Sequence, residues 1–462
     1  MTMASSRPPR RALWLALAPA LLAAAGGCGT VARARAAQSP GSAMPGERTP
    51  TAAELGLPAK GPVALAALVR TAVRVHPSVV GARRAAEAAA ARIYEAEAAR
   101  YPQVGVNATQ SVHDGTSKSS GGGSKSQRFE SLGFDVSWLV FDFGQTAALA
   151  RQAALAWLAA QQDVRTAEVA VALGVRTAYF ELGKQVDLLA TDREAVRQFQ
   201  EHLDQVKEFV RVGTRIPYDQ TKAEVDLGNA RLAEVQAKDG VLSAQATLAN
   251  AVGLAEVLDW VPAPDVAPLP VPGDFPAAWA AARARDPVLS AAIARERAAS
   301  ALVDARIAAL YPGVSVGLSY SKSGSSIPLP WSLDIGPKVQ WTPFDGFQNL
   351  STIDESVASL RESRASRAQA EQQAWLNVRT AWLALEDARE RLALTSLTLQ
   401  SAEESLTLAQ GRYDAGLATS VDLTDARVAL IQAKTARIQA RADLGIAAAR
   451  LAKALGVSVR EP

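Results

Sequence analysis

Few side chains in this sequence are of a type that does covalent or metal chemistry. The chain has one cysteine, Cys28, and three histidines, His76, His113 and His202. A single cysteine excludes a disulfide framework and a cysteine-based metal site. No strand-to-helix nucleophile elbow accompanies the histidines, so a serine-hydrolase arrangement is not indicated. The sequence therefore predicts no catalytic residues, no metal site and no cofactor.

The carboxylates of Asp422 and Asp425 form the most suggestive charged pair. They lie three positions apart at the start of an expected helix, so both point to roughly the same side. Two carboxylates on one side of a helix attract cations. Ser420 and Asp422 also suit the cap and the first-turn acid of a helix, which is a purely structural role. Over the whole chain, 49 Lys and Arg nearly balance 46 Asp and Glu, which argues against a nucleic-acid partner.

The N-terminus has the pattern of a secretory signal peptide, which we place at residues 1–27. A basic segment precedes an apolar run, 12–25, that is too short to span a bilayer. The run ends in Ala-Gly-Gly-Cys28, which resembles the lipobox of bacterial lipoproteins. That resemblance implies a covalent lipid on Cys28, and Gly29 after it implies the outer membrane.

The N-terminal region also contains a second candidate cleavage site. A cut after the small-residue pattern Ala34-Arg-Ala36 would discard the cysteine with the signal peptide. With the lipobox cut, residues 28–62 form an N-terminal tether.

The rest of the chain is a tandem repeat. Four landmarks occur in the same order in both halves. Pro77 recurs as Pro287, Tyr101-Pro102 as Tyr311-Pro312, Phe141-Asp142 as Phe344-Asp345, and Val212-Gly213 as Ala415-Gly416. We place repeat 1 at 63–259, a proline-rich equatorial linker at 260–276, repeat 2 at 277–457, and a C-terminal tail at 458–462.

Each repeat predicts a helix, a β-hairpin, a long helix and a short helix. Apolar residues alternate with small polar ones over the hairpins, whereas the helical stretches are alanine-rich and lack proline. The hairpins are expected at 103–141 and 313–343, the long helices at 144–212 and 346–415, and the short helices at 218–252 and 420–456. The Ser- and Gly-rich segment Asp114–Ser126 is expected to be an exposed loop of the first hairpin.

The expected strands are long enough to cross a bilayer. No apolar stretch after the signal peptide approaches the roughly 20 residues of a transmembrane helix, so a spanning chain would use strands of a closed barrel. Four strands are too few, because known barrels have about eight or more. Two chains would supply eight strands and three would supply twelve. The alternative is a pair of hairpins packed on a soluble core.

This layout resembles the TolC-type outer-membrane factors, and the resemblance covers about residues 63–457. The most specific match is Gly-Arg-Tyr413-Asp-Ala-Gly416-Leu-Ala-Thr-Ser-Val-Asp422-Leu-Thr-Asp425-Ala, a tyrosine, a glycine and a D-x-x-D-A helix start. The first turn, Val212-Gly213-Thr-Arg215-Ile-Pro-Tyr-Asp219, aligns with it. The resemblance implies a mainly α fold with a β-barrel, in which a trimer forms a twelve-stranded barrel continued by a periplasmic α-helical tube.

The resemblance also implies roles for particular residues. Asp219, Asp422 and Asp425 would line the pore aperture, and Tyr413, Arg215, Gly213 and Gly416 would make contacts at the helix turns. Where the family has an arginine partner this chain has Ala418, and Arg215 stands at the equivalent place of the first turn.

The function expected from this resemblance is an outer-membrane exit channel that is not an enzyme. It would pass small molecules such as drugs from a periplasmic adaptor and an inner-membrane transporter, either proton-driven or ABC. Outer-membrane lipid would surround the barrel, and the lipobox favours the efflux branch. The alternatives are the channel of a type I protein secretion system, a periplasmic coiled-coil scaffold and a secreted enzyme.

Overall fold

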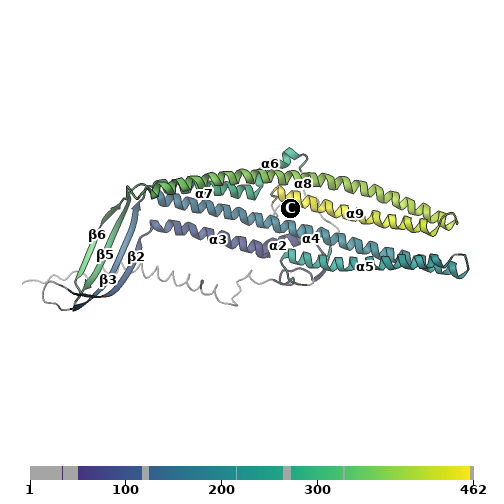
Figure 1. The fold of residues 1–462 in the computed structure, drawn as a ribbon, viewed down its shortest axis with the longest axis horizontal. Helices are drawn as coiled ribbons and strands as arrows, with labels where there is room; N and C mark the ends of the chain where they lie inside the picture. The colour runs from purple at the N-terminus through teal and green to yellow at the C-terminus, as the bar shows by residue number, and fades with distance from the viewer. Residues whose placement is uncertain are drawn as a thin grey trace, which may run out of the picture. The chain divides into compact units, whose positions relative to one another are not determined.

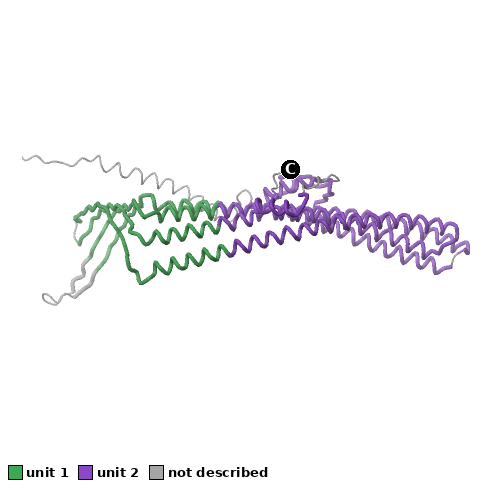
Figure 2. Tube along the Cα trace, turned by 90° about the horizontal axis from the view of Figure 1, so that it is seen from above, with its two compact units in different colours: residues 1–48, 87–157, 295–364 green, residues 49–86, 158–294, 365–462 purple. Residues whose placement is uncertain are grey.

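A computed structural model describes residues 34, 50–116, 124–214, 216–256, 258–263, 272–325 and 328–457. These residues fall into two compact units, coloured separately in Figure 2. Unit 1 contains residues 87–157 and 295–364, and unit 2 contains residues 49–86, 158–294 and 365–457. The expected signal peptide and Cys28 lie outside the described residues.

Unit 1 contains a four-stranded antiparallel sheet in the order β2-β3-β5-β6 (Figure 1). Its strands are β2 (Gln103–Thr116), β3 (Ser124–Phe141), β5 (Gly313–Gly324) and β6 (Trp331–Gln340). The period-two pattern gives the sheet one apolar face, on which Val106 and Ile335 are 76% and 71% exposed. This apolar face therefore has little cover within one chain.

The first hairpin differs from the expectation at its tip. The segment expected as a loop, Asp114–Ser126, is partly strand, because Asp114, Gly115 and Thr116 pair with Ser126, Lys125 and Ser124. Antiparallel pairing uses main-chain groups, so polar residues without an apolar pattern can continue the ladder. The residues between them, 117–123, lie outside the described part.

The same contacts join each hairpin to the residues just before it and to the start of the long helix after it. Trp138 Nε1 donates to the carbonyl of Arg100 at 2.9 Å, and Trp341 Nε1 donates to the carbonyl of Leu310 at 3.1 Å. Asp142 accepts from the backbone N–H of Thr146 at 2.7 Å, and Asp345 accepts from that of Asn349 at 3.0 Å. The Phe-Asp landmarks of the sequence are thus helix starts.

The helices α4 (Gln145–Arg211) and α8 (Gln348–Asp414) have 67 residues each, and both contribute to both units. The helices α5 (Pro217–Val252) and α9 (Ser420–Ala454) fold back along them within unit 2 (Figure 1). Before each hairpin the chain forms two helices with a proline at the break. These are α2 (Leu65–Val75) and α3 (Pro77–Glu97) in repeat 1, and α6 (Phe275–Arg285) and α7 (Pro287–Ala308) in repeat 2.

The cores of unit 2 confirm that the chain is a tandem repeat. One cluster packs α2, α4 and α5 around Val175, Leu182 and Leu248, and another packs α6, α8 and α9 around Val378, Leu385 and Leu451. Each residue of the second cluster follows its equivalent in the first cluster at the same distance along the chain: Val378 follows Val175, Leu385 follows Leu182 and Leu451 follows Leu248. Both repeats therefore bury equivalent positions.

A short parallel pair of strands was not expected. Residues Lys60–Val63 (β1) pair with Asp259–Pro262 (β4), so the end of the expected tether and the start of the linker are strands. Trp260 is fully buried there and donates from Nε1 to the carbonyl of Pro58 at 2.7 Å. The indole thereby fastens the N-terminal segment to repeat 1.

Candidate functional site

The turn between α4 and α5 is built by a glycine and a proline. Gly213 has φ 79°, a left-handed conformation that ends α4 at little steric cost. Thr214 N–H donates to the carbonyl of Phe209 at 2.9 Å, which closes the last turn. Pro217 then opens α5 with no side-chain cap before it. Arg215 lies outside the described residues, so its expected contact is not described.

The turn between α8 and α9 has the same glycine but a different helix start. Gly416 has φ 74°, and Leu417 N–H donates to the carbonyl of Arg412 at 2.8 Å. Thr419, rather than Ser420, caps α9: its hydroxyl accepts from Asp422 N–H, and the Asp422 carboxylate accepts from Thr419 N–H at 2.8 Å. The expectation that Ser420 is the cap was wrong by one position, since either hydroxyl suits a cap chemically.

Ser420 instead joins the two turns. Its side chain is buried, and its Oγ donates to Oδ1 of Asp219 on α5 at 3.3 Å. Both turns lie at the same end of unit 2 (Figure 1). The structure therefore brings Asp219 of the first turn within hydrogen-bond distance of the second turn.

Asp422 and Asp425 are both exposed on the first turns of α9. The pKa of Asp422 is lowered by the hydrogen bonds from the backbone and side chain of Thr419, and the charge of Arg412 acts in the same direction. Its carboxylate is therefore ionised near neutral pH. The helix-start role considered for Asp422 is present, and it leaves the charge exposed.

Tyr413 lies in the last turn of α8 and is 5% exposed. Its ring meets the ring of His202 on α4 edge-on, with centroids 6.1 Å apart and an interplanar angle of 63°. His202 is 3% exposed. No role is expected for His202 from the sequence alone, although it stands on the apolar stripe of α4 with Phe199, Leu203 and Val206, which are all buried.

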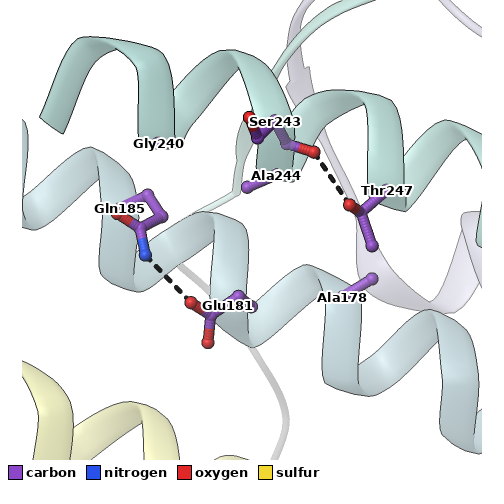
Figure 3. A pocket seen from close by; sticks show the side chains of 7 residues that line it. All are labelled: Ala178, Glu181, Gln185, Gly240, Ser243, Ala244 and Thr247. Carbon is purple, nitrogen blue, oxygen red and sulfur yellow. Dashed lines mark hydrogen bonds between the residues drawn. The ribbon is translucent and has the colours of Figure 1, made fainter. Parts of the chain in front are cut away.

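Two other features of the described residues, a cavity and a Gly-x-Ser-x-Gly match, do not form a catalytic site. A cavity of about 240 Å³ lies between α4 and α5, and its polar side chains bond within their own helices (Figure 3). Gln185 Nε2 donates to Glu181 Oε1 at 2.9 Å, and Thr247 Oγ1 donates to the carbonyl of Ser243 at 2.8 Å. The one Gly-x-Ser-x-Gly match of the sequence, residues 313–317, lies inside β5 and not at a strand-to-helix turn.

In the described part of the chain, no group of three or more His, Cys, Asp or Glu side chains is placed to hold a metal ion. None of the helices there combines the length and the apolar character needed to cross a membrane.

Comparison with known proteins identifies the family. The model of the outer membrane efflux protein family matches residues 68–254 and 279–457. The chain belongs to this family. Both matched ranges fall within the two repeats, and the resemblance to TolC-type outer-membrane factors is thereby confirmed.

Individual relatives agree with the family. The outer membrane efflux protein BepC of Brucella suis is 29% identical over 213 residues, which are 46% of this chain and 44% of BepC. The chain thus spans less than half the length of BepC in that match. Protein CyaE of Bordetella pertussis is 27% identical over 388 residues, 80% of this chain and 79% of CyaE.

Solved structures show the same fold. The Campylobacter jejuni CmeC outer membrane channel superposes with a TM-score of 0.75 at 17% identity, over 86% of this chain and 87% of CmeC. The expected fold class is confirmed. The matched family is one of outer-membrane transport proteins rather than enzymes.

Proposed function

We propose that three copies of this chain form one channel, which receives small molecules from a periplasmic adaptor and an inner-membrane pump. The observation that carries the proposal is the sheet of unit 1. Its edge strands, β2 and β6, have no further strand partner among the described residues. Unpaired strand edges are not tolerated in lipid, and four strands are too few for a barrel. Three copies supply twelve strands, enough for a water-filled interior.

The exposed apolar face of the sheet fits contact with lipid. Val104, Leu132 and Val339 are 52%, 53% and 66% exposed on it. Such a surface on a soluble protein would favour aggregation, whereas a barrel turns it toward the acyl chains.

Apolar stripes on α5 and α8 fit contacts between copies. Leu232, Val235 and Leu242 on α5 are exposed with spacings of three and seven, and Leu394, Leu397 and Leu408 on α8 form a similar row. This spacing is typical of a coiled-coil seam. We infer that these rows pack against neighbouring copies.

A pore is passive, so transport through it has to be driven by another protein. This supports an adaptor and an inner-membrane pump as partners of the channel. We further propose that Cys28 carries a lipid that anchors the N-terminal tether in the outer membrane.

The trimer can be tested with engineered cysteines after Cys28→Ala removes the native thiol. A cysteine on β2, at Val104, and one on β6, at Val339, should cross-link neighbouring copies into species of up to three chains in detergent. Either cysteine alone should give no ladder. A folded monomer that conducts no ions in a planar bilayer would overturn the proposal.

A further inference from the structure

An aromatic pair lies at the turn between each hairpin and its long helix. In repeat 1 the rings of Phe141 and Phe143 meet edge-on, with centroids 4.8 Å apart. In repeat 2 the rings of Phe344 and Phe347 meet edge-on, with centroids 5.3 Å apart. Both repeats therefore place two phenylalanine rings side by side at this turn.

The second phenylalanine of each pair has a strained backbone. Phe143 and Phe347 have φ 53° and 70°, in the left-handed region that glycine adopts freely and a bulky residue does not. A glycine follows Phe143 and precedes Phe347, so the ring of repeat 2 stands one position later in the turn. Strain of this kind persists where surrounding contacts compensate for it. A compensating contact is therefore expected for each of the two rings.

In repeat 1 that contact lies within the chain. The ring of Phe143 stacks on Tyr311, two residues before β5, with centroids 5.0 Å apart and an interplanar angle of 22°. In repeat 2 the rings are exposed: 63% for Phe347 and 69% for Phe344. Tyr101, which is the equivalent of Tyr311 before β2, is 66% exposed. One chain thus exposes an aromatic pair after β6 and a tyrosine before β2, and these are the two edge strands of its sheet.

The strand pairing indicates which residues of two copies would face each other. Within one chain, repeat 1 meets repeat 2 where β3 pairs with β5, and Val136 lies opposite Leu318. The equivalent residues are Val339 on β6 and Ala108 on β2. Both hairpins keep the same internal register, so this equivalence holds along the strands. A barrel closes when successive strands are staggered consistently, so β6 should meet β2 of the partner subunit with Val339 opposite the partner's Ala108.

We propose that Phe347 is an aromatic anchor between copies of the chain: its ring, supported by Phe344, stacks on Tyr101 of the partner subunit as Phe143 stacks on Tyr311 within one chain. The register derived for β6 and β2 brings these rings together, because the same register accompanies the stack between the two repeats. The inference rests on the proposed trimer and names the residues that join its copies where the barrel meets the helices.

The first experiment is Phe347→Gly in the full-length protein, because glycine removes the ring and also relieves the backbone strain. If the ring stacks on the partner's Tyr101, each junction between copies should weaken about two- to tenfold, which is the usual loss for one aromatic pair. The temperature at which the detergent-solubilised trimer separates into single chains, followed by light scattering, should then fall. An equal or higher temperature would mean that only strain was removed, and would overturn the anchor.

A double-variant cycle identifies the partner of the ring. Tyr101→Leu should weaken the trimer as Phe347→Gly does, and the two together should weaken it by less than the sum of their separate effects. Phe143→Gly is the matched control, because its ring stacks within the chain: its effect should couple to that of Tyr311→Leu and add to that of Tyr101→Leu. Simple addition of the Phe347→Gly and Tyr101→Leu effects would overturn the anchor.

Cross-linking separates a failure of the anchor from a failure of the trimer. After Cys28→Ala, the pair Val339→Cys and Ala108→Cys should form a direct disulfide between copies, since opposite residues of paired strands lie close enough. Val104 lies four positions further along β2, about 13 Å away, so the pair Val339→Cys and Val104→Cys needs a longer bifunctional reagent. The disulfide at Ala108 together with an unweakened Phe347→Gly trimer would overturn the anchor and leave the trimer intact. A folded single chain that yields neither cross-link would overturn the trimer itself.

Discussion

The exposed carboxylates of Asp422 and Asp425 allow a sharp test of the aperture. We predict that Asp422→Asn plus Asp425→Asn lowers the cation selectivity of the channel. Asparagine keeps a side-chain oxygen that can accept from Thr419 N–H, so the start of α9 is preserved while the charge is lost. This choice separates charge from helix capping better than alanine does.

The change in cation selectivity should depend on the salt concentration, because the helix sets the distance between the two carboxylates. Three positions along a helix correspond to a rise of about 4.5 Å. In a trimer the two aspartates would form two tiers of three carboxylates at that separation. The tiers act as one charged ring at 0.1 M salt, where the Debye length is about 10 Å, but are largely screened at 1 M, where it is about 3 Å. The lowered pKa of Asp422 means that its charge is present in the wild-type protein at pH 7.

The assay is the reversal potential across a planar bilayer with a salt gradient. At 0.1 M the cation-to-anion permeability ratio of the double variant should fall toward one, and at 1 M the two proteins should differ little. Thr419→Val is the control, since it removes the hydroxyl half of the capping box and leaves both carboxylates. An unchanged ratio in the double variant, or an equal fall in Thr419→Val, would show that the aspartates only start the helix.

Three other parts of the chain give simpler predictions. Cys28→Ala should abolish acyl labelling of the mature protein without preventing insertion, whereas a mature chain that starts after Ala36 would refute lipidation. A protease site placed at Gly122 should be cut in whole cells if the first hairpin points outward, and cutting only after outer-membrane rupture would invert the topology. Leu182→Ala should destabilise the fold by about 2–5 kcal/mol and lower the thermal midpoint, because Leu182 is fully buried. Leu417→Ala, at a residue that is 73% exposed, should change the midpoint little.

Much of the fold was predictable because its signals are local and repeated. The glycines at 213 and 416 and the prolines at 77 and 287 mark the ends and breaks of helices, and period two separates strands from helices. The duplication doubles each signal, so a weak pattern in one half is supported by the other.

The features that the sequence did not reveal depend on distant contacts. Lys60–Val63 is too short to be recognised as a strand, and its partner lies almost two hundred residues away. The role of Trp260 follows from that pairing. His202 could have been noticed as a polar residue on an apolar stripe, but its contact with Tyr413 exists only when α4 and α8 are packed side by side.

The two turns show how equal repeats come to carry unequal roles. Asp219 and Asp422 are equivalent in sequence, yet Asp219 accepts a hydrogen bond from Ser420 across the turns whereas Asp422 caps its own helix. The difference arises at the helix starts, because Pro217 opens α5 without a capping side chain and Thr419 opens α9 with one. A carboxylate engaged with a neighbouring turn holds structure together, whereas Asp422 and Asp425 leave their charge facing solvent. The charge at the aperture should therefore depend on α9 more than on α5. Asp219→Asn alone should alter the contact with Ser420 rather than the cation selectivity.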